Sequence, residues 1–213
     1  RHSSAASDVY KRQVLNNLRQ EISKGKRPNY CLSDFIMPKK YGKKDWIGAF
    51  AVTAGTNVEK LSKISSKNNN DYESIMIKVI GDRIAEAMAE KMHKLVRTDF
   101  WGYSYGEKFS NEDLIRERYS GIRPAPGYPA CPDHSEKMKI WKLLDIKNNS
   151  NMKLTESFAV TPASSVTGWY FSHPKSKYFA VNRISKEQLK DYSQRKGVAE
   201  KDLKKIFPHI LEE

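Results

Sequence analysis

Hydrophobic positions recur every three or four residues between Tyr72 and Arg97, a spacing that predicts a long helix with one apolar stripe. The stripe consists of Ile77, Ile80, Ile84, Met88, Met92 and Leu95. Capping residues and similar spacing predict five shorter helices. They are Val14–Lys24, Asn111–Arg118 behind the N-cap Ser110, a helix capped by Ser135 that runs to about Leu144, Lys186–Arg195 and Ala199–Phe207.

Runs of β-branched and aromatic residues between glycine, proline or serine predict strands in two parts of the chain. One strand is predicted within Trp46–Gly55, and three more are predicted at Glu156–Thr161, Thr167–Ser172 and Tyr178–Ile184. Short turns separate the last three, so we expect them to form an antiparallel meander. Neither an internal repeat nor a long linker interrupts the pattern, which therefore predicts a single domain of mixed α+β class.

The first residues do not share this pattern. Residues 1–13 have no hydrophobic period, and "DVYKRQ" at 8–13 resembles one reading frame of a transposon end used in sequencing libraries. We therefore treat residues 1–13 as a non-native leader and expect the domain to occupy residues 14–213.

The 213 residues carry a formal net charge of +13 and two cysteines. The charge suits a nucleic acid, an anionic membrane surface or an acidic protein, and it equally suits a solvated lysine-rich surface. No apolar run approaches the roughly 18 residues that span a bilayer, which argues against a membrane protein. Cys31 and Cys131 cannot form a disulfide framework, and this favours a reducing compartment.

Several motifs that would indicate a catalytic or metal site are incomplete. Glu90 and His93 have the Glu-x-x-His spacing of di-metal carboxylate sites, but such sites need a second pair, which the chain lacks. Cys131 and His134 have no second pair for zinc, so Cys131 is better explained as a packed side chain. Neither Gly-x-Gly nor a Walker loop occurs, and this excludes the nucleotide-binding folds that need them.

Three carboxylates, Asp82, Glu86 and Glu90, sit four residues apart on the long predicted helix. Like charges at this spacing repel one another, so the row is either solvated or faces something cationic. The row also argues against a continuous phosphate track, and no nucleic-acid motif is recognisable, so we do not expect nucleic-acid binding.

The segment "RPAPGYPACPDHSEK" at 123–137 combines features of a small-ligand site. Its four prolines exclude a helix or central strand and lower the entropy lost when the loop is ordered. Arg123 offers a fork of donors that suits a carboxylate. Gly127 permits close approach to the main chain, and Tyr128 offers a flat face with a polar end. These features predict a zwitterionic ligand with a flat ring, such as an amino-acid-bearing nucleoside.

The same segment, as "GIRPAPGYPACPDHSEK", resembles the signature loop of the C-terminal activation domain of cobalamin-dependent methionine synthase. Further segments resemble that family in the expected order over nearly the whole chain after residue 14. They include "KRPNYCLSDFI", "IGAFAVTAG", "DRIAEAMAEKMHKLVR", "NEDLIRERYSGIR", "MKLTESFAVTPASSVTGWYFSHPKSKYFAV" and "DYSQRKG".

The resemblance implies an S-adenosylmethionine-binding module with a twisted antiparallel sheet flanked by helices. It implies a role in reductive remethylation of cob(II)alamin, with the cobalamin held by a neighbouring domain and the electron supplied by flavodoxin or a flavoprotein reductase. The parent would be a cytoplasmic methyltransferase of methionine biosynthesis, and this chain alone would not be catalytic. A protein that only binds S-adenosylmethionine or a related nucleoside is the alternative.

The resemblance also implies roles for individual residues. Arg123 would bind the ligand carboxylate, the backbone around Ala125 and Gly127 would hold the ligand, and Tyr128 would lie near the cobalamin. Tyr178 and Phe179 match a second binding segment, and Glu86 and Glu117 match acidic positions near the sulfonium centre. The family's Asp-Trp-x-Pro-Phe-Phe segment, whose aspartate binds the ligand ammonium, does not occur here, so we expect the domain to be incomplete at its N-terminal side.

Overall fold

A computed structural model describes residues 13–22, 25 and 27–211, so the predicted leader lies outside the described residues except for Gln13. The fold combines helices with two small antiparallel sheets and is of the predicted α+β class. The α-helices are α1 (Asn57–Lys67), α2 (Asp71–Leu95), α3 (Asn111–Ile115), α4 (Lys137–Leu143), α5 (Ile146–Asn149), α6 (Lys186–Lys196) and α7 (Glu200–Ile206). The strands are β1 (Gly48–Thr53), β2 (Lys153–Leu154), β3 (Val160–Thr161) and β4 (Ser165–Tyr170). Short 3-10 helices lie at Leu32–Phe35, Lys39–Tyr41 and His134–Glu136, and a π-helical turn, Val96–Phe100, continues α2.

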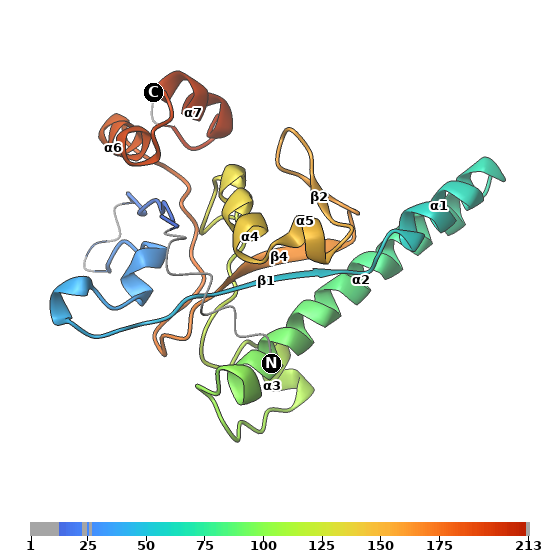
Figure 1. Cartoon of the computed structure of the whole chain (residues 1–213), viewed down its shortest axis with the longest axis horizontal. Coiled ribbons are helices and arrows are strands. Elements are labelled where there is room, and N and C mark those ends of the chain that lie inside the picture. The colour runs from blue at the N-terminus through green and yellow to red at the C-terminus, as the bar shows by residue number, and fades with distance from the viewer. Residues whose placement is uncertain (1–12, 23–24, 26, 212–213) are drawn as a thin grey trace.

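The central sheet pairs β1 with β4, which lie side by side through the middle of the molecule (Figure 1). Gly48 faces Tyr170 at one end of the register, and Thr53 faces Ser165 at the other. Alternate residues of β1 are buried, as expected of a strand with one face on a core. The strand predicted within Trp46–Gly55 is confirmed, although its partner comes from far along the chain.

The predicted antiparallel meander is wrong. β4 pairs with β1, while β3 pairs with β2 through Lys153 opposite Thr161. Residues 178–184 form no strand, because their backbone donors are used elsewhere: the amide of Val181 donates to the carbonyl of Pro129 at 2.8 Å. This segment therefore runs against the proline-rich loop instead of extending the sheet.

The helix predicted at Val14–Lys24 is also wrong over its described part, and Ser23 and Lys24 lie outside the described residues. The chain pairs instead with the segment that follows it. Arg19 forms an antiparallel bridge with Cys31, and the amide of Gln20 donates to the carbonyl of Tyr30 at 3.0 Å. These contacts replace the local hydrogen bonds of a helix.

Helix α2 confirms the long helix, but only part of the apolar stripe that predicted it packs: Met92 contacts the core, whereas Ile80, Ile84 and Met88 are exposed. Its buried positions are mostly small, namely Ser74, Gly81, Ala85, Ala89 and His93. At Gly81 an added Cβ would lie 2.6 Å from the side chain of Val58 on α1, so only glycine allows this close contact. Ile80, at 52%, and Ile84, at 47%, are exposed. Helices α1 and α2 pack together and project from the body as an arm (Figure 1).

The remaining predicted helices are confirmed with different boundaries. α3 begins at the capping box of Ser110 and Asp113, as predicted, but ends already at Ile115. The helical region before α4 is capped by Asp133 and not by Ser135, because both the amide and the hydroxyl of Ser135 donate to the Asp133 carboxylate. Helices α6 and α7 occur where the two charged helices were predicted.

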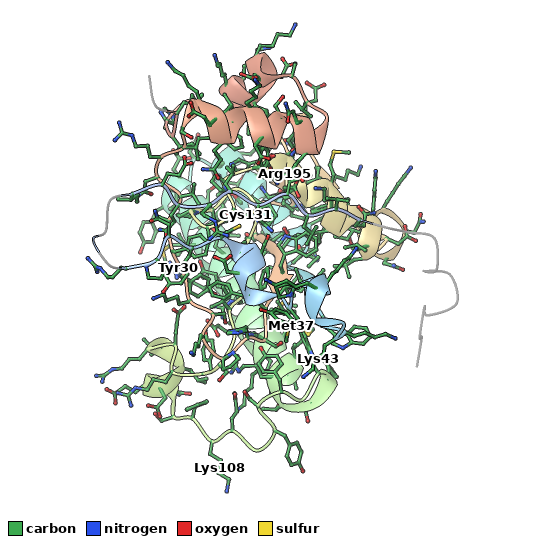
Figure 2. The ribbon with its side chains drawn as sticks, turned by 90° about the vertical axis from the view of Figure 1, so that its left-hand side faces the viewer. Tyr30, Met37, Lys43, Lys108, Cys131 and Arg195 are labelled. Atoms are coloured by element: carbon green, nitrogen blue, oxygen red, sulfur yellow. The ribbon has the colours of Figure 1, made fainter. Side chains whose placement is uncertain are left out.

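The C-terminal helices are tied to the C-terminal end of the proline-rich loop (residues 123–137) by buried polar contacts. Lys196 of α6 contacts the carboxylate of Asp133 and donates to the hydroxyl of Ser135 at 2.6 Å. The Tyr192 hydroxyl donates to Asp133 at 2.7 Å. Figure 2 shows Cys131 near the middle of the molecule, below these helices. It is a buried free thiol, so the prediction that it is packed is confirmed.

Candidate functional site

The proline-rich loop is anchored along its length by backbone hydrogen bonds. The backbones of Ile122 and Phe171 exchange two hydrogen bonds of 3.0 Å, and the amide of Trp169 donates to the carbonyl of Pro124 at 2.9 Å. Beyond this point the amide of Gly127 donates to the carbonyl of Cys131 at 2.7 Å. The loop therefore lies along the edge of β4 and holds Arg123 between two fixed points.

Arg123 is held by the side chains that surround it. Its backbone amide donates to the hydroxyl of Tyr178 at 3.0 Å, and its guanidinium Nη1 donates to the hydroxyl of Tyr119 at 3.0 Å. Nη2 forms an ion pair with the carboxylate of Glu90, and Nη1 lies 3.4 Å from Nδ1 of His93. Only 18% of the arginine side chain is exposed. The fork is therefore oriented before any ligand arrives.

His93 supports this arrangement as a neutral ring. The ring is fully buried and stacks on Tyr170 with ring centroids 5.2 Å apart. Its Nε2 atom lies 3.2 Å from the hydroxyl oxygen of Tyr103. Burial, reinforced by the charges of Arg97 and Arg123, lowers the pKa of His93 to about 3. A guanidinium can only donate, so Nδ1 accepts from Arg123 and the proton lies on Nε2, which donates to Tyr103.

A buried ion pair closes the inner side of the site. The guanidinium of Arg97 donates to Glu107 at 2.6 Å and lies over the ring of Tyr119, 4.0 Å from its centroid. The side chains of Arg97 and Glu107 are 0% and 5% exposed, respectively. Arg97 and Arg123 therefore both contact Tyr119, and burial raises the pKa of this tyrosine.

The structure brings some predicted site residues to Arg123. The hydroxyl of Tyr178 accepts a hydrogen bond from the backbone amide of Arg123. Burial raises the pKa of Tyr178 to about 12, although the charge of Arg123 opposes this shift. Glu117 is exposed, and its charge adds only weakly to the raised pKa of Tyr178 and Tyr119. The ring of Phe179 instead packs against two aromatic rings of the N-terminal region, with centroids 6.1 and 6.4 Å away.

Ala125, Gly127 and Tyr128 line a different space, a cavity of about 710 Å³ whose far wall is formed by residues 157–167. Its volume falls within the range of small-molecule sites. Gly127 has φ +91°, and the room beside its Cα is taken by His134, where an added Cβ would lie 2.4 Å from the ring. Glycine is therefore needed here for the packing of His134.

The three carboxylates of the acidic row have three separate partners. Asp82 accepts from the hydroxyl of Ser164 at 2.7 Å, and Glu86 pairs with Arg83 at 2.6 Å. Glu90 pairs with Arg123. The structure thus does not bring Glu86 into contact with Arg123, although it lies one turn before Glu90 on the same helix.

Glu90, His93 and Tyr119 are neighbours of Arg123 that the sequence did not identify as site residues. Glu90 and His93, noted in the sequence for their Glu-x-x-His spacing, share one side of α2, and both contact the guanidinium of Arg123. Repulsion along the acidic row had indicated a cationic neighbour as one alternative. No sequence signal connected that neighbour with Arg123, which is 33 positions away from Glu90.

Comparisons with known proteins relate this chain to one family. The crystal structure of a MetH reactivation domain bound to AdoHcy superposes with a TM-score of 0.90 at 51% sequence identity, over 92% of this chain. The chain covers 61% of that protein chain. A family model described as the activation domain of vitamin B12 dependent methionine synthase matches residues 3–197. Over the described residues, no helix has both the length and the apolar character needed to cross a membrane. The chain belongs to the family of activation domains of vitamin B12-dependent methionine synthase.

Proposed function

We propose that this chain binds S-adenosylmethionine at the Arg123 loop and presents its methyl group to a cobalamin held by a neighbouring domain. The observation that carries the proposal is the Arg123 fork, which is largely buried and fixed on an anchored loop. A preorganised guanidinium of this kind is suited to a carboxylate. The likeness to a reactivation domain bound to AdoHcy, the demethylated form of the same ligand, supports the choice.

We assign one role to the Arg123 side of the loop and another to the Tyr128 side. Arg123 would bind the ligand carboxylate, with Tyr178 beside it and the acidic side chains nearby compensating the sulfonium charge. The exposed ring of Tyr128, 66% accessible, suits contact with a partner domain that carries the cobalamin. The full set of proposed binding residues is Arg123, Ala125, Gly127, Tyr128, Tyr178, Phe179, Glu86 and Glu117.

The chemistry divides between this chain and its partners. Bound cobalamin would supply the methyl acceptor once one electron has reduced it from cob(II)alamin. The residues assigned here bind and orient the methyl donor, and none of them needs to act as an acid or base. We therefore propose that catalysis of homocysteine methylation, the reaction of methionine biosynthesis, belongs to the parent methyltransferase and not to this chain alone.

The electron donor would be flavodoxin or a flavoprotein reductase in the cytoplasm. The net charge of +13 favours an acidic partner, and both cysteines are free thiols, as in proteins of a reducing compartment. Association should slow steeply between about 0.05 and 0.2 M salt, which stopped-flow mixing with flavodoxin can measure. An association rate that does not depend on salt would indicate that the lysines form only a solvated surface.

We also propose that the site needs the aspartate-bearing segment that the 213 residues do not contain. Arg123 would hold only one end of a zwitterionic ligand. An ionic hydrogen bond contributes about 1.5 to 3 kcal/mol, so this chain should bind roughly 10- to 100-fold more weakly than one extended through that segment. Equal affinities of the two polypeptides, measured by calorimetry, would contradict the proposal.

Replacement of Arg123 tests the binding role directly. Arg123→Ala should weaken AdoHcy binding by about 2 to 3 kcal/mol, or roughly 30- to 150-fold, because a charge-assisted contact to the carboxylate is lost. Arg116→Ala is the matched control, since this exposed arginine forms an ion pair with Glu112 on α3. Isothermal titration with equal affinities for the wild type and Arg123→Ala would overturn the assignment, provided that circular dichroism shows both to be folded.

A further inference from the structure

Glu90 occupies part of the fork of Arg123. The carboxylate forms an ion pair with Nη2, while the other guanidinium contacts go to the neutral partners Tyr119 and His93. Among the contacts described for this guanidinium, the one with Glu90 is therefore the contact with a charged group. A ligand carboxylate that binds this guanidinium, as proposed above, would compete with Glu90 for the same donors.

The two partners differ in how freely they can separate. The Arg123 side chain is 18% exposed and is further held by Tyr119, whereas the Glu90 side chain is 45% exposed. Half-exposed ion pairs contribute little to stability, because water solvates the separated charges. The glutamate can therefore leave for solvent, while the arginine stays in position.

An alternative position for the Glu90 carboxylate lies on its own helix. Glu90 borders an open cavity of about 490 Å³ that is also lined by Lys91, Lys94 and residues of α3. Lys94 is four residues further along α2, and a glutamate four residues before a lysine is a favourable helical pair. Rotation of Glu90 away from Arg123 would thus exchange one cation for another.

We infer that Glu90 acts as an internal competitor that sets the affinity for carboxylate-bearing ligands by occupying Arg123 until the ligand carboxylate displaces it. The inference rests on the proposed binding of an amino-acid-bearing nucleoside at Arg123. A nucleoside without a carboxylate cannot displace Glu90 and gains nothing from this arginine. Glu90 thereby lowers the affinity for ligands that carry the amino-acid portion and leaves the affinity for nucleosides without it unchanged.

Titration calorimetry on the whole chain with two probes tests this inference. The probes are AdoHcy and 5′-methylthioadenosine, which shares the nucleoside and thioether but has no carboxylate. Glu90→Gln should bind AdoHcy about 3- to 10-fold more tightly than the wild type, because the competing ion pair is gone, and should bind 5′-methylthioadenosine equally well. Glu112→Gln, which removes the same charge from α3, is the control and should change neither affinity.

Glu90→Asp separates the contact from the charge, since it keeps the carboxylate but shortens its reach. It should show the same gain for AdoHcy as Glu90→Gln. An unchanged or weaker affinity for AdoHcy in both variants would overturn the inference, as would an equal gain for both probes. If the wild type binds AdoHcy through Arg123 and only this gain is missing, the proposed function stands and the role of Glu90 falls. A wild type that binds no AdoHcy overturns both.

Discussion

Acidification should destabilise this domain through His93, a buried ring that the fold accepts only in its neutral form. Burial and the nearby charges of Arg97 and Arg123 lower the pKa of His93 from 6.5 to about 3. In the unfolded chain the same ring takes up a proton below about pH 6.5. The unfolded state therefore binds more protons than the folded state between these two values.

The sign and size of the effect follow from this difference in bound protons. The contribution of a neutral His93 is fully present above about pH 6.5 and is lost progressively as the pH falls toward about 3. One proton gives a limiting slope of about 1.4 kcal/mol per pH unit. Between about pH 7.5 and about pH 5.5 the free energy of unfolding should fall by about 1.4 kcal/mol.

Urea unfolding followed by circular dichroism at these two pH values measures the effect. The comparison is with His93→Gln, which cannot titrate and should lose correspondingly less stability on acidification, whatever its stability at neutral pH. His209→Gln serves as the control, because His209 is exposed and its variant should keep the wild-type pH dependence. Equal losses in the wild type and in His93→Gln would refute the reasoning.

Three further substitutions test the packing. Gly168→Ala should cost about 1 to 3 kcal/mol in thermal unfolding and weaken AdoHcy binding, since the new Cβ would lie 2.8 Å from the carbonyl of Pro124; an unchanged melting temperature would contradict this. Arg97→Leu should lower the free energy of unfolding in urea by about 3 to 5 kcal/mol, because Glu107 stays buried without its partner. Adding Glu107→Leu should recover much of this loss, and a double variant as unstable as the single one would argue against the mechanism. Ile84→Lys should change stability by less than about 0.5 kcal/mol, and a loss of several kcal/mol would show that this exposed side chain is packed.

Sequence reasoning succeeded where the signal is local. Capping at Ser110 predicted the start of α3, and periodicity predicted α2, because both depend on residues within one or two turns. Pairing of β1 with β4 could not be predicted in this way. Neighbouring strands joined by short turns usually pair, whereas Gly48 and Tyr170 are brought together by the packing of the whole domain.

The same division applies to the candidate site. The stiffness of the loop and the prominence of Arg123 were evident from the prolines around it, which constrain the backbone locally. Its partners Glu90 and His93 were noticed only as a spacing on a helix. Which way that side of α2 faces depends on small buried residues such as Ala89, whereas a search for large hydrophobic residues selects a neighbouring stripe that is largely exposed.

The contacts between Lys196 and Asp133 have a consequence for the order in which the protein can mature during synthesis. Helix α2 needs only neighbouring residues and can form early, whereas the strand that supports the Arg123 loop emerges from the ribosome far later than β1. The contacts that fix the C-terminal end of that loop are complete only when Lys196 has been made. Ligand-binding competence is therefore acquired late in translation, and a nascent chain that stops before α6 would present a formed helical arm beside an unfinished site.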